Sequence, residues 1–359
     1  MAEKSGFDGN AVVYCEGFFN TPYGKTAHGL VRFTKRYKVV ALLDSRYAGR
    51  DAGLILDRKA NGIPIYERLS HAREAAEKSG TPLTHFVIGL APDGGALSES
   101  ARAAVLEAVS AGLCVDSGLH SFLSDDPEIA ALAKKNGVTL RDIRKTPERK
   151  YLHPFTGRIS EVESYRIALL GTDSAVGKRT TAWKVKDALD AADIDTAFIG
   201  TGQTAWLQGA RYSLIMDSLI NDFVAGEIEH AILSAWDAEH PRAMVIEGQG
   251  SLMNPIYPGG FEILAAGRPQ AVVLQHAPAR KEYDGLPGYP LHSLETQIQA
   301  IEMLSGCPVV AITINHEGLE PEAVPSICEE IAAATGLPTA DPLLQKLDAL
   351  VDLFKGRIV

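Results

Sequence analysis

The fold is decided by one stretch near the middle of the chain, Arg166-Ile-Ala-Leu-Leu-Gly-Thr-Asp-Ser-Ala-Val-Gly-Lys-Arg-Thr-Thr181. An apolar strand over 167–170 leads into a loop bounded by Gly171 and Gly177, and a helical pattern begins at Gly177 and Lys178. This order is typical of a phosphate-binding loop, because backbone N–H groups and a helix N-terminus converge on an anion and the lysine adds a point charge. The expected phosphate contacts are Thr172, Asp173, Ser174, Ala175, Val176, Gly177, Lys178, Arg179 and Thr180.

The loop departs from the strict nucleotide-binding pattern at two places. Five residues separate Gly171 from Gly177, where the pattern has four, and Arg179 follows the lysine, where a serine or threonine would hold Mg²⁺. We therefore expect a loop that binds phosphate without a metal. A glycine-rich strand-to-helix turn with a chance lysine is the alternative interpretation.

Strand-like and helical segments alternate from end to end, which indicates parallel α/β architecture, and 359 residues favour two domains. We expect an N-terminal Rossmann-like parallel-sheet domain at 1–140, a charged linker at 141–165 and a P-loop NTPase-like α/β domain at 166–359. The expected strands are 11–16, 38–43, 84–90, 113–116, 167–170, 196–199, 243–246, 271–275 and 309–314. The expected helices lie near 67–79, 98–111, 126–136, 177–191, 213–235, 293–305 and 322–335.

Composition excludes several classes of protein. A formal net charge of −10 disfavours nucleic-acid binding, and no apolar run reaches the roughly 20 residues of a membrane span. The polar start lacks the apolar core of a signal peptide, and the four cysteines are far apart without a Cys-x-x-Cys pair. These features predict a cytoplasmic protein with no structural zinc.

The strongest catalytic candidate is Glu247, which ends an apolar strand and precedes two glycines in Glu247-Gly-Gln-Gly-Ser251. A carboxylate in this place could hold a metal-bound water or accept a proton, and the glycines admit close approach of a ligand. Capping of the following turn is the alternative role. His276 is the second candidate, in the polar loop 275–290, and a further polar loop spans 200–212.

Cationic and polar side chains on other strand-end loops are candidates for binding a substrate, because ligands of parallel sheets lie beyond the carboxyl ends of the strands. Guanidinium groups suit carboxylates, so a substrate that carries a carboxylate is one expectation. The candidates are Lys25, Arg46, Arg50, Arg211, Gln249, Tyr283 and Asp284.

These motifs carry a family resemblance. Gly171-Thr-Asp-Ser-Ala-Val-Gly-Lys178 with Glu247-Gly-Gln-Gly250 is similar to the dethiobiotin synthetase branch of P-loop proteins, which has threonine directly after the lysine. The chain as a whole resembles the D-glutamate N-acetyltransferase (DgcN) family. That resemblance rests on Gly177-Lys-Arg-Thr-Thr181, Gln208-Gly-Ala-Arg-Tyr212, Asp222-Phe-Val-Ala-Gly-Glu227, Glu247-Gly-Gln-Gly-Ser-Leu252 and Tyr283-Asp-Gly-Leu-Pro287.

The resemblance implies acetyl transfer from acetyl-CoA to the amine of D-glutamate, with no metal, and a racemase-like pathway partner that uses N-acetyl-D-glutamate. Coenzyme A phosphates would then occupy the loop, which makes the missing metal hydroxyl understandable. A homo-oligomer is also expected. Two alternatives remain: a Mg-ATP-dependent kinase or ligase of the dethiobiotin synthetase type, and a non-catalytic nucleotide- or metabolite-binding regulator.

Overall fold

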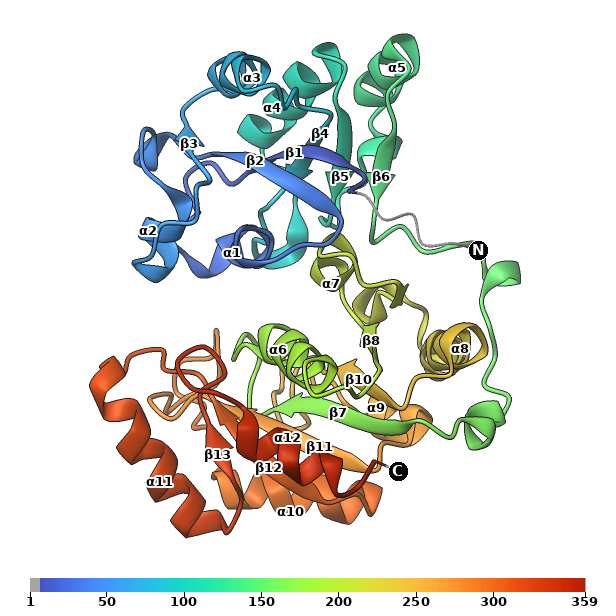
Figure 1. The fold of residues 1–359 in the computed structure, drawn as a ribbon. Helices are drawn as coiled ribbons and strands as arrows, with labels where there is room; N and C mark the ends of the chain where they lie inside the picture. Colours follow the sequence, from blue (N-terminus) through green and yellow to red (C-terminus); the bar gives the residue numbers. More distant parts are fainter. Residues whose placement is uncertain (1–6, 359) are drawn as a thin grey trace. The chain divides into compact units, whose positions relative to one another are not determined.

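The computed structural model describes residues 7–358 and divides into two compact units. Each unit consists of two segments of the chain. The first unit is formed by the chain up to Thr146 together with Gln203–Ala210, and the second by Pro147–Gly202 together with the chain from Arg211 onward (Figure 1). No helix within residues 7–358 has both the length and the apolar character needed to cross a membrane.

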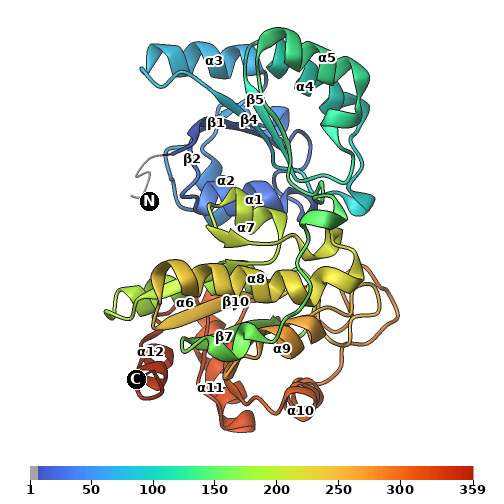
Figure 2. The same cartoon turned by 90° about the vertical axis from the view of Figure 1, so that its right-hand side faces the viewer.

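The first unit is a parallel sheet with strand order β3-β2-β1-β4-β5-β6, the order of doubly wound dinucleotide-binding folds. Helices α3, α4 and α5 cover one face of this sheet, and α1 and α2 lie on the other (Figures 1 and 2). The strands are β1 (Gly9–Tyr14), β2 (Tyr37–Leu43), β3 (Ile65–Tyr66), β4 (His85–Ile88), β5 (Cys114–Ser117) and β6 (Leu140–Asp142). The helices are α1 (Lys25–Arg32), α2 (Ala52–Asp57), α3 (Leu69–Lys78), α4 (Glu99–Ser110) and α5 (Pro127–Asn136).

The second unit is a larger parallel sheet with strand order β13-β12-β11-β7-β10-β8-β9. The strand before the glycine-bounded loop, β7, is central, so the loop opens at the middle of the carboxyl edge. The strands are β7 (Tyr165–Gly171), β8 (Thr196–Gly200), β9 (Tyr212–Ser213), β10 (Ala243–Glu247), β11 (Ala271–His276), β12 (Val309–Ile314) and β13 (Thr339–Ala340). The helices are α6 (Lys178–Asp190), α8 (Asn221–Glu239), α9 (Phe261–Gly267), α10 (Leu294–Ser305), α11 (Val324–Thr335) and α12 (Asp348–Lys355).

The expected α/β class is confirmed, and the longer elements lie close to the expected places. The strands β3 and β13 were not predicted because two residues are too few to show a pattern, and α1 was not predicted because it spans only eight residues and contains Gly29. Helix α8 begins at Asn221 rather than at 213, since residues 212–213 form the edge strand β9.

Strand β6 lies where the sequence pattern suggested the start of a charged linker. The reason is a buried charge: Arg141 of β6 forms an ion pair with Asp116 on the neighbouring strand β5, and Asp116 is fully buried. The hydroxyl of Tyr37 donates to the same carboxylate at 2.5 Å. The charged residue Arg141 is thus part of a strand because its carboxylate partner, Asp116, lies on the neighbouring strand.

Helix α7 (Gln203–Leu207) belongs to the first unit, although the chain on both sides of residues 203–210 belongs to the second. It packs beside α1, on the sheet face that α3, α4 and α5 leave uncovered (Figure 2). Leu207 is fully buried in the apolar core of the first unit. The sequence predicted only a polar loop at 200–212, since the contacts that fold this segment are remote in sequence.

Replacement of Asp116 by alanine should lower the melting temperature of the first unit by about 5–10 °C. The change leaves the Arg141 guanidinium partly buried without its carboxylate, a loss on the order of 3 kcal/mol. Calorimetry of the whole chain measures this, with Arg32→Gln as control, because the Arg32–Asp57 pair is exposed and worth about 1 kcal/mol or less. Equal melting temperatures for the two variants would contradict a structural role for Asp116.

Candidate active site

The loop between β7 and α6 has the backbone of an anion-binding turn. Ala175 and Gly177 both adopt left-handed conformations, with φ of 52° and 102°. Gly177 is the N-cap of α6, and Lys178 is the first helical residue. The N-terminus of a long helix is therefore directed toward the loop, with its dipole favouring negative charge.

Lys178 is 7% exposed, and its side chain folds back over the loop. Its Nζ donates to the carbonyl oxygen of Asp173 at 2.7 Å and to that of Gly250 at 2.6 Å. Gly171 is required beneath it, because a Cβ at that position would lie 2.8 Å from Lys178 Cδ. The Lys178 ammonium thus lies between the loop that joins β7 to α6 and the turn that follows Glu247.

The carboxylate of Asp173 is fully buried and organises the loop. It accepts hydrogen bonds from the backbone N–H groups of Ser174 (2.6 Å) and Asp284 (2.8 Å). It also accepts from Asn254 Nδ2 at 2.8 Å and from Arg280 Nη1 at 2.9 Å. Asp173 therefore joins the loop to two other segments of the second unit, and its carboxylate is engaged before any ligand arrives.

Two further side chains hold the loop from β11 and β12. Thr172 Oγ1 and His276 Nδ1 are 3.0 Å apart, and Asn315 Nδ2 donates to the carbonyl oxygen of Val176 at 3.1 Å. Burial, with the charge of Lys281, lowers the pKa of His276 to about 4. The imidazole is therefore neutral at neutral pH.

Glu247 ends β10, which pairs with β7 so that Glu247 lies opposite Leu169. The side chain is 3% exposed and accepts a hydrogen bond from the Thr201 N–H at 2.8 Å. Burial raises the pKa of Glu247, opposed chiefly by the charge of Arg179 and by the N–H groups of Thr201 and Gly202. The carboxyl thus combines a raised pKa with a nearby cation.

The turn after Glu247 requires its glycines. A Cβ at Gly248 would lie 2.1 Å from the Leu169 carbonyl oxygen, and one at Gly250, where φ is 50°, would lie 2.2 Å from the Tyr257 carbonyl oxygen. The side-chain amide of Gln249 donates to Thr201 Oγ1 at 3.0 Å. The backbone of this turn therefore runs closely over β7, beside the loop.

The structure brings only part of the expected substrate-binding set to this edge. Asp284 donates its backbone N–H to Asp173, and the nearby Tyr283 is buried with its hydroxyl 2.7 Å from His292 Nδ1. Arg211 instead pairs with Glu239, the last residue of α8, which leads to the amino end of β10. The guanidinium of Arg211 thus has a carboxylate partner within the second unit.

The remaining cationic candidates belong to the first unit. Lys25 is the first residue of α1, and Arg50 is exposed. Arg46 follows the carboxyl end of β2 and already has a carboxylate partner, since its Nη2 lies 2.9 Å from Asp44 Oδ2. Within residues 7–358, no three His, Cys, Asp or Glu side chains are grouped as metal ligands would be.

Sequence reasoning missed the residues that support this site. Thr201 could have been found as the polar residue that follows β8, and Asn254 as the start of an Asn-Pro turn. Their partners Glu247 and Asp173 are remote in sequence, so only the fold shows the contacts.

Replacement of Asp173 by alanine should loosen the loop, because it removes a buried carboxylate with four hydrogen-bond donors. We expect a lower melting temperature of the second unit and faster amide hydrogen exchange at 171–178 and 280–284. Asp284→Ala is the control, since alanine keeps the N–H that bonds to Asp173. Unchanged exchange in Asp173→Ala would show that the loop is held by other contacts.

Comparisons with known proteins agree with this architecture. Residues 45–146 match the domain of unknown function DUF1611_N, a Rossmann-like domain, and residues 153–351 match its DUF1611_C P-loop domain. A DUF1611 family protein from Anabaena variabilis has a crystal structure with a TM-score of 0.88 at 26% identity, covering 97% of this chain and 99% of that one.

Two curated relatives carry a functional name. A D-glutamate N-acetyltransferase of Tritonibacter scottomollicae is 33% identical over 79% of this chain and 83% of its own. A D-glutamate N-acetyltransferase of a Pseudoalteromonas species is 34% identical over 74% of this chain and 80% of its own. The chain therefore belongs to the DUF1611 family, within which it is a relative of the D-glutamate N-acetyltransferases.

Proposed function

We propose that this protein transfers the acetyl group of acetyl-CoA to the amine of D-glutamate, giving N-acetyl-D-glutamate. The observation that carries the proposal is a buried carboxylate, Glu247, on the strand next to an anion-binding loop, in a chain whose curated relatives are D-glutamate N-acetyltransferases. The names of the relatives support the reaction, and the geometry supports the residue roles proposed below.

The loop 171–178 is the proposed site for coenzyme A phosphates. The N-terminus of α6 attracts a phosphate, and the Lys178 ammonium can exchange its two carbonyl partners for phosphate oxygens, which accept stronger charge-assisted bonds. Arg179 follows the lysine, where Mg-nucleotide loops carry a hydroxyl. This favours coenzyme A binding without added metal over the alternative of a Mg-ATP-dependent kinase or ligase.

Glu247 is the proposed general base. An ammonium group cannot attack a thioester, so the bound amine must first lose a proton, and an effective base has a pKa near the working pH. Burial raises the pKa of Glu247 toward that range, whereas the pKa of His276 is lowered to about 4. Of the two catalytic candidates, Glu247 therefore has the more suitable basicity.

The transfer is proposed to be direct. The amine lone pair attacks the thioester carbonyl carbon to form the C–N bond, and the resulting oxyanion can be stabilised by N–H groups of the 248–250 turn. Collapse of this intermediate breaks the C–S bond and releases the coenzyme A thiolate, which takes up the second proton of the amine nitrogen, while the first proton passes from Glu247 to solvent. Burial raises the pKa of the Cys15, Cys307 and Cys328 thiols, so none of these three is an activated nucleophile for an acetyl-enzyme.

The acceptor contacts follow from the remaining candidates. Gln249, Tyr283 and Asp284 lie near the loop edge of the second unit, and Lys25, Arg46 and Arg50 of the first unit stay predicted partners of the two carboxylates. Arg211 also stays a predicted partner, and its guanidinium, like that of Arg46, forms an ion pair within its own unit. A homo-oligomer, a cytoplasmic location and a racemase-like pathway partner also stay predictions.

Lys178→Ala should raise the KM for acetyl-CoA by about 10- to 100-fold, because a lost charged hydrogen bond costs roughly 1.5–3 kcal/mol. The control is Lys186→Ala on the same helix, where the lysine pairs with Asp190 away from the loop. Thermal shift should show stabilisation of the wild type by acetyl-CoA without metal. Stabilisation by Mg-ATP alone would favour the kinase or ligase alternative.

Glu247→Gln should lower kcat by about 10²–10⁴ at neutral pH, the usual share of general-base catalysis, and leave the KM for acetyl-CoA nearly unchanged. Because the pKa of Glu247 is raised, the wild-type rate should fall as pH decreases through that raised pKa, while the variant lacks this limb. Activity should partly return at high pH, where free amine is present in solution.

His276→Gln serves as the comparison and should have the smaller effect, since neutral His276 contributes no titration near neutral pH. Wild-type turnover in Glu247→Gln would assign the base elsewhere. Ping-pong kinetics with an isolable acetyl-enzyme would exclude direct transfer.

A further inference from the structure

The segment Gln203–Ala210 begins directly after Gly202, the last residue of its part of the second unit, and is built into the first. The two residues before it, Thr201 and Gly202, are those whose N–H groups act on Glu247. The link is covalent and short: no residue separates the segment from these donors. A restraint on Gln203 therefore acts on Gly202 through the peptide bond that joins them.

The segment is anchored by hydrogen bonds that a solvent-exposed loop would not need. The buried Gln208 donates its side-chain amide to the carbonyl oxygens of Gly29 (2.9 Å) and Phe33 (3.0 Å). In return, the backbone N–H of Lys35 donates to the Gln208 carbonyl oxygen at 2.8 Å, and Thr34 Oγ1 donates to that of Leu207 at 3.1 Å. The end of α1 and the residues after it thus hold Leu207 and Gln208 in place.

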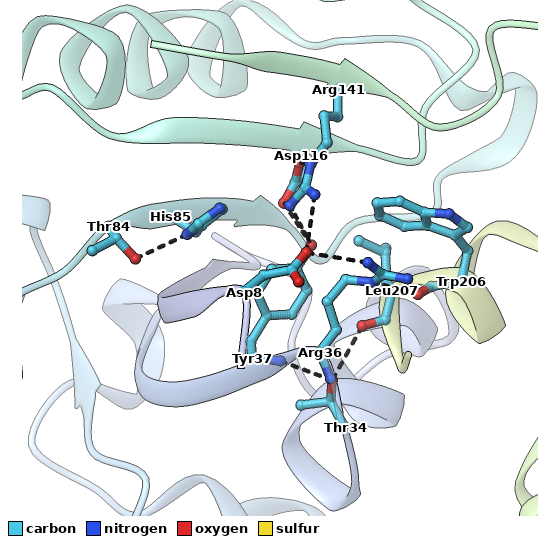
Figure 3. A network of polar contacts seen from close by, with 10 residues as sticks. All are labelled: Asp8, Thr34, Arg36, Tyr37, Thr84, His85, Asp116, Arg141, Trp206 and Leu207. Carbon is cyan, nitrogen blue, oxygen red and sulfur yellow. Dashed lines mark hydrogen bonds and ion pairs between the residues drawn. The ribbon is translucent and has the colours of Figure 1, made fainter. Parts of the chain in front are cut away.

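Trp206 adds an electrostatic anchor, shown in Figure 3. The guanidinium of Arg36 lies 3.7 Å from the ring centroid of Trp206, and that of Arg141 lies 5.2 Å from it. Arg36 Nε also donates to the Trp206 carbonyl oxygen at 2.8 Å. Asp8 pairs with both arginines, and Asp116 pairs with Arg141, so the cations are themselves held in place.

At the other end, Thr201 bonds to Glu247 and Gln249 through both its backbone N–H and its hydroxyl. Its N–H donates to Glu247 Oε2 at 2.8 Å, and its hydroxyl donates to the Glu247 carbonyl oxygen at 3.0 Å. The same hydroxyl accepts from Gln249 Nε2 at 3.0 Å. A Cβ at Gly202 would lie 2.9 Å from Gln249 Nε2, so a larger residue there would displace the Gln249 side chain.

We propose that residues 203–210 are a positioning element for Glu247, through which the first unit sets the hydrogen-bond donors on the carboxylate of the proposed base. This inference rests on the proposed function, in which Glu247 deprotonates the amine. Trp206, Leu207 and Gln208 are positioning residues, since they touch the first unit and act on the carboxylate only through Thr201 and Gly202.

The direction in which the pKa of Glu247 should change depends on the hydrogen bonds that its carboxylate accepts. N–H groups that bond to a carboxylate favour its charged form, so their withdrawal raises its pKa. The charged groups that act on Glu247 are Arg179 and Lys178 of α6, which belong to the second unit. Weakening the anchor should therefore keep Glu247 protonated to higher pH without changing the phosphate-binding loop.

The test compares the pH dependence of kcat in anchor variants of the full chain, with acetyl-CoA and D-glutamate as substrates. Gln208→Ala changes the segment itself and removes the hydrogen bonds that the Gln208 side-chain amide donates. Arg36→Gln leaves the segment unchanged and removes the guanidinium that bonds to the Trp206 carbonyl oxygen. In both, the acid limb of kcat should move up by about one pH unit, since loss of a hydrogen bond to a charged group has about that effect. The KM for acetyl-CoA should stay within about two-fold of wild type.

Arg32→Gln is the matched control, because Arg32 lies on the same stretch of the first unit but pairs with the exposed Asp57. A merely structural role would lower the active fraction or the melting temperature and leave the position of the acid limb unchanged. Such unchanged profiles in both anchor variants would overturn the inference. If Gln208→Ala does not fold, Thr34→Val gives the same comparison with a smaller expected shift, since it removes a hydroxyl that donates to Leu207 and also accepts from the Arg36 N–H.

The two proposals fail in distinguishable ways. Wild-type turnover in Glu247→Gln would remove the base and, with it, the proposed mechanism. If Glu247→Gln lowers kcat as expected but the pH profiles of Gln208→Ala and Arg36→Gln match that of the wild type, only the positioning role of the segment is excluded.

Discussion

The carboxyl edge of the second sheet depends on one buried carboxylate, that of Asp173. Placing a charge in a site without solvent is unfavourable unless hydrogen bonds and opposite charge compensate it. Here the compensation comes from two backbone N–H groups, an asparagine amide and the Arg280 guanidinium. Because these donors come from three separate segments, satisfying the charge also fixes the loop, and the loop in turn places Lys178 against the turn that follows Glu247.

A second buried carboxylate has the same role in the first unit. Asp116 binds Arg141 and Tyr37 across the sheet, and Arg141 together with Arg36 flanks the indole of Trp206 (Figure 3). Polar anchors of this kind specify a position more sharply than apolar packing does, because their bonds are directional and a lost partner is costly. These directional bonds therefore define the position of the segment 203–210 within the first unit more closely than apolar packing alone would.

The first unit also shows that a fold does not determine a function. Its strand order is that of dinucleotide-binding proteins, in which a carboxylate after the second strand binds a ribose. Here that position is Asp44, which is fully buried and accepts from the Phe19 N–H at 2.9 Å as well as from Arg46. The carboxylate is used for internal structure, and in the proposed mechanism the phosphates are bound by the second unit instead.

The sequence by itself determined the class of both domains and the anion-binding loop, because these depend on local patterns. Alternating apolar strands and helices give parallel sheets, and the spacing from Gly171 to Lys178 defines the turn and the helix N-terminus within a few residues. Glu247 was also visible, since a carboxylate that ends an apolar strand and precedes glycines is a local signal. Only the tertiary structure decided which residues support these groups. Thr201 reaches Glu247, Arg280 reaches Asp173, and Trp206 reaches Arg36 across more than 40 residues of chain in each case. Such contacts follow from strand order and register, which bring distant segments together and which no local pattern encodes.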